Sequence, residues 1–152
     1  EFDGQFISYF KNGQIDEDKN FEYGKKEGVF TWYYENGQIE KENYYKDGVI
    51  DGKHVIYFAN GQLDYEYNYK DGVKDGRQVS YYEDGQLHYE HNYKNDVEDG
   101  KQVDYEEDGQ LLSEYNYKDG QKHGKWIEYN INGDIVSEHE YFNEKRWKSR
   151  RR

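Results

Sequence analysis

The chain of 152 residues contains no cysteine, no proline and no methionine. The absence of cysteine excludes disulfides, thiolate metal sites and cysteine nucleophiles. No apolar run approaches the length of a membrane-spanning helix, and nothing resembles a signal peptide. Because hydrophobic residues make up only 33% of the chain and the mean hydropathy is -1.46, a large closed aliphatic core is also excluded.

Aromatic residues take the place of the missing aliphatic ones. Tyr, Phe and Trp make up 19% of the chain, too much for a disordered polypeptide even though 36% of the residues are charged. We therefore expect a folded domain whose apolar surface is mainly aromatic.

Glycines recur with a period of 24 residues along the whole sequence. One series runs through Gly4, Gly28, Gly52, Gly76, Gly100 and Gly124, and a second through Gly13, Gly37, Gly61, Gly85, Gly109 and Gly133. A fixed period of this length is typical of stacked-repeat proteins, in which each unit buries its apolar face against its neighbours. The sequence therefore indicates six copies of one unit, and a function carried by a surface instead of a pocket.

Each unit reads as a β-hairpin, because apolar and polar residues alternate on either side of an Asn-Gly or Asp-Gly turn. A two-residue turn would place Tyr57 and Leu63 on opposite faces. We prefer a three-residue loop at 59–61 with Gly in the left-handed region, which pairs Tyr57 with Leu63. The same register pairs Val55 with Tyr65.

The second turn of each unit follows the same logic. A three-residue loop at 70–72 places Tyr69 opposite Val73 and carries the same face into the next unit. The predicted fold is all-β: an elongated single-layer antiparallel meander of about six stacked 24-residue hairpins, twisted and curled into a trough. We assign residues 1–143 to this repeat domain and residues 144–152 to a basic C-terminal tail.

The predicted register sorts the side chains into a regular face and a variable face. The regular face is expected to carry the aliphatic series with Val55 and Leu63, the tyrosine series with Tyr57, and a second aromatic series. That second series is Phe21, Tyr45, Tyr69, Tyr93, Tyr117 and Tyr141. The variable face is apolar in the first three units and polar further on, where Gln78, Ser80, Gln102 and Asp104 follow.

The apolar part of the variable face is the candidate binding site, because an antiparallel sheet normally solvates one of its faces. We hypothesise that it forms a partner-binding or self-association surface. Its residues are Phe6, Phe10, Phe30, Trp32, Tyr34, Ile56 and Phe58. The alternative is that they pack on a missing N-terminal segment, since the sequence begins inside a repeat.

Charge divides the chain into two unequal parts. Residues 144–152 contain six basic residues and one Glu, a net charge of +5, so residues 1–143 carry the remaining 15 basic and 32 acidic residues, a net charge of -17. A body this acidic is not expected to bind nucleic acid, nor a membrane except through the basic tail. We expect the tail to be a solvated, disordered terminus that could still contact an anion.

Patterns that suggest catalysis or metal binding are weak. His88 and His91 are three residues apart on a strand, so we expect them on opposite faces, where they cannot share a metal ion. The repeated acids Glu42, Glu66, Glu90, Glu114 and Glu138 are interpreted as a structural ladder that pairs with Lys53, Arg77, Lys101 and Lys125. We predict no cofactor, no metal and no enzymatic activity.

The segments Tyr-Tyr-Glu-Asn-Gly-Gln-Ile at 33–39, Lys-Asp-Gly at 46–48 and Asp-Gly-Lys at 51–53 resemble the MORN repeat variant. The resemblance covers residues 4–143 and implies a single-layer sheet of stacked hairpins that acts as a scaffold, a dimerisation module or a partner-binding groove. In the last unit Asp134 replaces Gln and Glu144 replaces the second-turn Gly, so the segment from 131 to 147 is expected to be a terminal cap.

Three functions remain open at this point. We favour a non-enzymatic scaffold for protein interaction or self-association, because folding alone explains aromatic residues at fixed repeat positions. The first alternative is an antitoxin-type protein that neutralises a cognate toxin, which rests on the resemblance alone. The second is a carbohydrate or cell-wall binding module that stacks sugar rings on the aromatic side chains.

Overall fold

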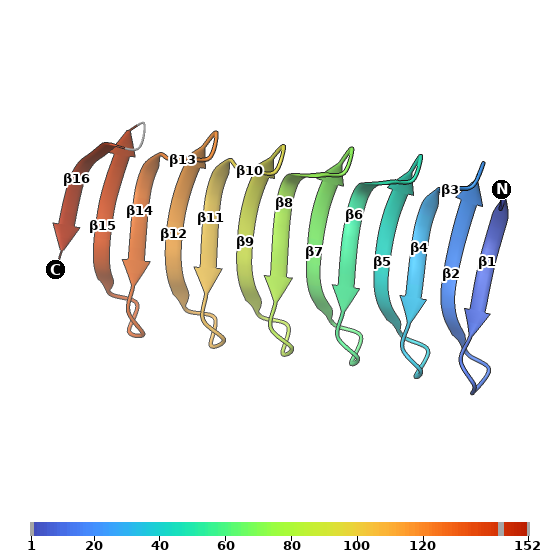
Figure 1. The fold of residues 1–152 in the computed structure, drawn as a ribbon. Helices are drawn as coiled ribbons and strands as arrows, with labels where there is room; N and C mark the ends of the chain where they lie inside the picture. Colours follow the sequence, from blue (N-terminus) through green and yellow to red (C-terminus); the bar gives the residue numbers. More distant parts are fainter. Residues whose placement is uncertain (1, 143–144, 152) are drawn as a thin grey trace. The chain divides into compact units, whose positions relative to one another are not determined.

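The computed structural model describes residues 2–142 and 145–151, and Figure 1 shows these residues as β-strands joined by tight turns. Within the described part of the chain there is no helix long and apolar enough to cross a membrane. Within each of the two compact units of the chain, neighbouring strands along the path pair in an antiparallel meander, as the alternating pattern predicts.

The chain divides into two compact units, Glu1–Val73 and Lys74–Arg152. The N-terminal unit is a single layer with the strand order β1-β2-β4-β5-β6-β7, and the short β3 lies beside β2. Its strands are β1 Gly4–Tyr9, β2 Ile15–Glu22, β3 Lys25–Lys26, β4 Gly28–Tyr33, β5 Ile39–Lys46, β6 Val49–Tyr57 and β7 Leu63–Lys70.

The C-terminal unit has the same construction, with β8 Val73–Tyr81 starting one residue before it. Its other strands are β9 Leu87–Lys94, β10 Val97–Glu98, β11 Gly100–Tyr105, β12 Leu111–Lys118, β13 Gln121–Lys122, β14 Gly124–Tyr129, β15 Ile135–Phe142 and β16 Lys145–Arg151. The prediction of a disordered basic tail is wrong for β16, which pairs with β15 from Lys145 opposite Phe142 to Arg151 opposite Ser137. Glu144 and Arg152, which belong to the same prediction, lie outside the described residues.

The first turn of each hairpin has the predicted three-residue loop. The backbone N–H of Gly61 donates to the carbonyl of Phe58 at 2.8 Å, and the N–H of Phe58 donates to the carbonyl of Gln62 at 2.8 Å. Gly61 has a φ of 87°, the left-handed conformation that glycine adopts without steric cost. Tyr57 therefore lies opposite Leu63, and this part of the prediction is confirmed.

A β-bulge directly after this pair overturns the rest of the predicted register. The register shifts between Ile56 and Tyr57, so Ile56 lies opposite Tyr65 and Val55 lies opposite Glu66. The predicted pairing of Val55 with Tyr65 is wrong because Asp64 is an extra residue on β7, and a bulge of this kind changes which face the following residues occupy. In all six repeats, the hairpin that encloses the first turn has its bulge at the same place.

The second turn differs from the prediction as well. Lys46 lies opposite Val49 and Tyr45 opposite Ile50, so only Asp47 and Gly48 form the loop. Their φ angles are 51° and 86°, as in the two-residue turns that match the twist of paired strands. Asp71 and Gly72 have φ angles of 49° and 85° and separate β7, which ends at Lys70, from β8, which begins at Val73. The three-residue loop predicted at 70–72 is therefore wrong.

The corrected register defines two faces in each unit. We call one the valine face, with the buried residues Thr31, Val55, Val79 and Val103. The other, the aromatic face, carries the second aromatic series with Phe21, Tyr45 and Tyr69, which the sequence placed with the valines. Its own buried residues are Phe30, Asn43, Gln78, Ser80, Gln102 and Ser113. A thin sheet thus buries a narrow line of side chains on each face.

Candidate functional site

The seven residues of the predicted site lie on the aromatic face of the N-terminal unit or in the turns beside it. Phe6, Phe30, Trp32 and Ile56 belong to strands β1, β4 and β6. Phe10, Tyr34 and Phe58 directly follow these three strands and begin the first turns. The site is therefore a cross-strand surface instead of a pocket.

Phe30 forms the packed centre of this surface. Its ring centroid lies 5.2 Å from that of Phe21 and 4.9 Å from that of Tyr45, and Phe30 is 1% exposed. Close aromatic contacts of this kind stabilise a sheet through burial and ring geometry. Phe30 therefore supports the surface from within the fold.

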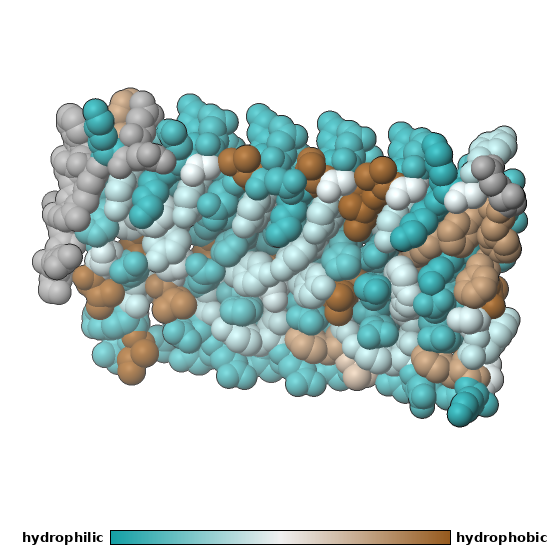
Figure 2. Space-filling model, in the orientation of Figure 1, coloured by the Kyte–Doolittle hydropathy of each residue, from teal (hydrophilic) through white to brown (hydrophobic). Residues whose placement is uncertain are grey.

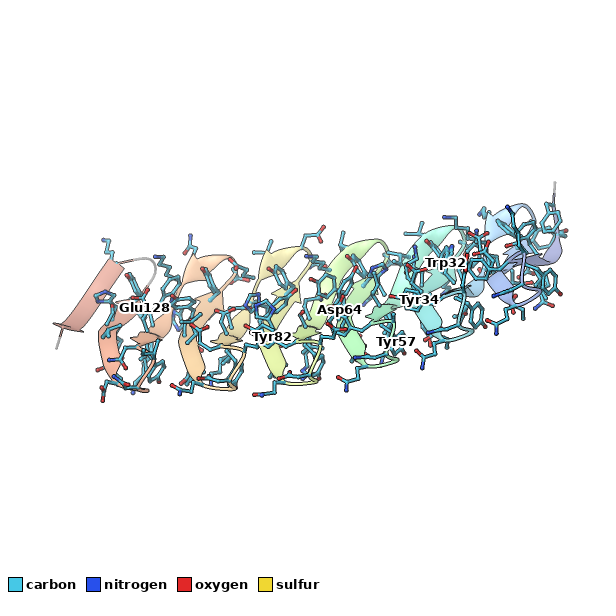
Figure 3. The ribbon with its side chains drawn as sticks, turned by 90° about the horizontal axis from the view of Figure 1, so that it is seen from below. Trp32, Tyr34, Tyr57, Asp64, Tyr82 and Glu128 are labelled. Atoms are coloured by element: carbon cyan, nitrogen blue, oxygen red, sulfur yellow. The ribbon has the colours of Figure 1, made fainter. Side chains whose placement is uncertain are left out.

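Trp32 lies at the centre of a charged cluster on three strands. Its indole Nε1–H donates to Glu17 on β2 at 2.9 Å. The Nζ atoms of Lys41 on β5 and Lys19 on β2 lie 4.0 and 5.2 Å from its ring centroid. Trp32 is half-buried, so its ring is held in one orientation while part of it stays exposed. Figure 3 shows Trp32 and Tyr57 on opposite sides of the ribbon.

Glu17 connects two other members of this cluster, Lys19 and Trp32. It forms an ion pair with Lys19 at 2.6 Å and accepts the Trp32 N–H. The hydrogen bond from Lys19 is the largest influence, and it keeps the pKa of Glu17 below its ordinary value against the opposing effect of burial. The carboxylate is therefore ionised at neutral pH and already used by its two partners.

Phe6 and Ile56 border the cluster on either side. Phe6 is 41% exposed, and its ring lies 5.9 Å from the Nζ atom of Lys19. Ile56 is half-buried and lies opposite Lys41 in the register of β5 and β6. Figure 2 shows hydrophobic atoms gathered at its right-hand end, where Figure 1 places β1 to β4.

The turn residues of the site are tied to the backbone of the next hairpin. The Tyr34 hydroxyl donates to the carbonyl of Tyr57 at 2.7 Å, and burial is the main cause that raises the pKa of Tyr34. Phe10, Tyr34 and Phe58 are all half-buried. Part of the surface of these three side chains is therefore used within the fold.

The C-terminal unit has a polar network at equivalent positions. His91 Nε2 lies 2.9 Å from one oxygen of Asp104, and Ser113 Oγ donates to the other at 2.6 Å. Burial would raise the pKa of Asp104, but the hydrogen bonds from His91 and Ser113 outweigh it and lower this pKa. Because Ser113 is bonded to Asp104 and not to His91, the group lacks the nucleophile-to-base contact of a catalytic triad.

The expected separation of His88 and His91 is wrong. The ring of Tyr89 lies 5.2 Å from His88 and 4.6 Å from His91, because the bulge brings residues three apart to the same face. Among the described residues, no group of three or more His, Asp and Glu side chains is placed to hold a metal ion.

The predicted acid ladder is confirmed on the valine face for three of its ion pairs. Lys53 pairs with Glu66 at 2.9 Å and Arg77 with Glu90 at 2.8 Å, and Lys101 pairs with Glu114. Each pair joins the two strands of one hairpin. The repeated carboxylates therefore have the structural role that their spacing suggests.

Sequence reasoning missed the lysines of the aromatic face. Lys19 and Lys41 follow the bulge on their strands, so alternation counted through the turn assigns them to the wrong face. The one signal in the sequence is that positions 17, 41 and 65 hold residues of different types, unlike the constant positions of the ladder.

A protein-family model described as MORN repeat variant matches six consecutive segments of the chain. These are residues 2–23, 26–47, 50–71, 74–95, 98–119 and 122–143. The matched segments have the 24-residue period of the glycines, and each covers most of one repeat. No curated protein is similar enough to the chain to count as a match.

Proposed function

Since the chain belongs to the MORN repeat variant family, whose members are generally non-enzymatic interaction scaffolds, we propose that it binds another protein through the aromatic face of its N-terminal unit. The contact residues are Phe6, Trp32 and Ile56, with Phe10, Tyr34 and Phe58 at the edge and Phe30 as their packed support. The alternative is self-association through the same face, and a measurement of the oligomeric state distinguishes it from binding of another protein.

One observation carries this proposal. A single repeat position holds Ser8, Trp32 and Ile56 in the N-terminal unit, whereas its equivalents in the C-terminal unit are all polar: Ser80, Asp104 and Glu128. The C-terminal repeats form the same hairpins with polar residues there, so the fold does not require an apolar side chain at this position. Half-exposed apolar residues that folding does not require are typical of interaction surfaces.

The test compares two double variants of the full chain. Phe6→Ala with Trp32→Ala removes the proposed contacts, and Tyr9→Ala with Val29→Ala removes exposed apolar side chains, 62% and 39% exposed, from the opposite face. Thermal denaturation checks that both variants fold. Proteins captured from the native host are then purified and their affinities for each variant measured.

We expect the first variant to lose at least about 2 kcal/mol of binding free energy, as is common for buried aromatic contacts, and the second to bind like the wild type. Sedimentation over a range of concentrations tests self-association in the same variants. Equal binding by all three proteins, or binding to glycans with no protein partner, would overturn the proposal.

A further inference from the structure

The lysines on the two faces have different partners. On the valine face, Lys53 and Lys101 form ion pairs with carboxylates of the adjacent strand. On the aromatic face, Lys41 lies 4.0 Å from the ring centroid of Trp32, and Lys26 lies 4.6 Å from that of Tyr45. Lysines above aromatic rings are stabilised by the electron-rich ring face.

These ammonium groups have no carboxylate partner although acidic residues dominate the chain, with 33 Asp and Glu against 21 Lys and Arg. Within residues 2–142 and at Lys145, where side chains are described, no carboxylate lies within ion-pair distance of Lys26 or Lys41. Glu17 is the nearby acid on this face, and Lys19 and Trp32 already occupy it.

Lys19 and Lys41 alternate with apolar side chains across neighbouring strands. Lys19 lies opposite Phe6, Trp32 lies between Glu17 and Lys41, and Lys41 lies opposite Ile56. A ring contacts one side of each ammonium group, so N–H donors remain for a second partner on the other side. The surface therefore presents positive charge and apolar area in the same small region.

Resting on the proposed function, we propose that the partner contributes an acidic polypeptide segment whose carboxylates bind Lys41, Lys26 and Lys19 while its apolar side chains contact Phe6, Trp32 and Ile56. At Lys26 and Lys41 the carboxylates complete ion pairs that the chain itself leaves unformed, and at Lys19 they add to the existing ion pair with Glu17. Charge complementarity of this kind sets specificity and association rate.

A short acidic segment fits this surface better than a nucleic acid or an anionic membrane. The body of the chain carries a net charge of -17, by the count given above, and it would repel a long or extended array of phosphates. At physiological salt, dissolved ions screen the interaction between exposed charges that are more than about 8 Å apart. A few carboxylates bound at the lysines therefore experience mainly the attraction of these lysines. The acids Asp16, Glu40 and Asp64 lie at the bulges next to the turns and border the site on that side.

The experiment measures binding of a labelled synthetic peptide, in which Glu alternates with Leu and Phe, to the full chain by fluorescence anisotropy. A peptide with Gln in place of every Glu is the neutral counterpart. The test variant is Lys26→Gln with Lys41→Gln, and Lys41→Arg tests whether charge alone is sufficient. The matched control, Lys53→Gln with Lys101→Gln, removes the same charge from the valine face.

We expect the Glu peptide to bind the wild type and the control equally. Its affinity for the test variant should be at least about tenfold lower. Lys41→Arg should retain binding, the Gln peptide should bind weakly, and added salt should weaken binding of the Glu peptide. Equal affinity for the two peptides, or full affinity in a test variant that keeps its melting temperature, overturns the inference.

Two further probes test the choice of ligand. Tighter binding of an oligothymidine, or of vesicles containing phosphatidylserine, than of the Glu peptide would replace the acidic segment by a phosphate ligand and overturn the inference. The proposed function fails separately, if Phe6→Ala with Trp32→Ala leaves partner binding intact. If Phe6→Ala with Trp32→Ala abolishes partner binding but Lys26→Gln with Lys41→Gln binds the partner normally, the proposed function stands and only the inference of an acidic segment fails.

Discussion

Gly28 on β4 lies directly opposite Tyr45 on β5, and every leading glycine of the 24-residue period faces an aromatic residue in this way. The other pairs are Gly4 with Phe21, Gly52 with Tyr69, Gly76 with Tyr93, Gly100 with Tyr117 and Gly124 with Tyr141. An aromatic ring across the strand compensates for the packing that a glycine lacks. The first glycine series therefore marks a paired position in the sheet, whereas the second marks a turn.

Replacing Gly28 by Ala should destabilise the protein by about 1 to 2 kcal/mol, because an L-residue resists positive φ. Gly28 has a φ of 75°, and a Cβ atom there would meet no other atom within 4 Å. The cost therefore arises from the backbone and not from crowding. Urea denaturation with a two-state fit gives the free energy of unfolding.

Gly28→Asn separates the two causes. Asn is larger than Ala but tolerates the left-handed region better, so it should cost less than Ala. A larger loss for Asn than for Ala would show that crowding decides the position.

His54 should make stability depend on pH near neutrality. Burial, followed by the charge of Lys41, lowers the pKa of His54 below 6.5, so the unfolded chain takes up a proton at a higher pH than the folded one. The contribution of His54 to the free energy of unfolding is then fully present above pH 6.5 and is lost as the pH falls through the pKa of His54 in the folded protein. An NMR titration of the ring protons measures this pKa directly.

His54→Gln is the natural control, because Gln78 and Gln102 hold the same repeat position. The variant should fold and lose the part of the pH dependence that His54 contributes, while the other four histidines remain. Parallel stability curves for the two proteins between pH 5 and 8 would contradict the assignment.

Val103 and Lys101 are neighbours on the valine face with different expected contributions to stability. Val103 is 8% exposed, so Val103→Ala should cost about 2 kcal/mol through lost burial and a small cavity. Lys101 is 54% exposed in its ion pair with Glu114, and Lys101→Ala should cost below about 1 kcal/mol after allowance for solvent screening. Denaturation in about 1 M NaCl should remove the second loss and leave the first.

Asn36 connects successive first turns through its side-chain amide. Its Nδ2 donates to the carbonyl of Ala59 at 3.1 Å, and its Oδ1 accepts the N–H of Gln38 at 2.9 Å. Asn36→Asp keeps the acceptor but loses the donor, so it should cost about 0.5 to 1 kcal/mol.

Asp84 already occupies the equivalent turn position and accepts the N–H of Gln86. The reverse change, Asp84→Asn, should therefore leave stability unchanged or raise it in the same denaturation assay. A clear loss of stability in Asp84→Asn would show that the amide donor does not matter in this turn.

The hairpins, their number and the first turn could be predicted from the sequence because local chemistry determines them. Asn60-Gly61 supplies the residue with positive φ, and the pair Tyr57 and Leu63 follows from the length of the loop. The second turn was predicted wrongly because Asp47 adopts the left-handed conformation beside Gly48, which Asp tolerates but does not signal.

The bulge could not be predicted, and it decides which residues share a face. The extra residue is Asp64 in one hairpin and Leu112 in another, so no residue type identifies it, unlike a bulge that requires glycine. The predicted site residues on β1, β4 and β6 precede the bulge and were placed together correctly. Lys19 and Lys41 come after it, and their position beside Trp32 could not be derived from alternation.

The bulge and the two-residue second turn together explain why the period of the repeat is an even number of residues. In each hairpin the valine face is reached from odd positions such as Val55 before the bulge and from even positions such as Glu66 after it. The two-residue second turn restores the odd positions, because Lys46 lies opposite Val49, so the next repeat starts with the same assignment. Duplication or loss of a whole repeat leaves both faces intact, whereas loss of one residue would exchange them in every repeat downstream.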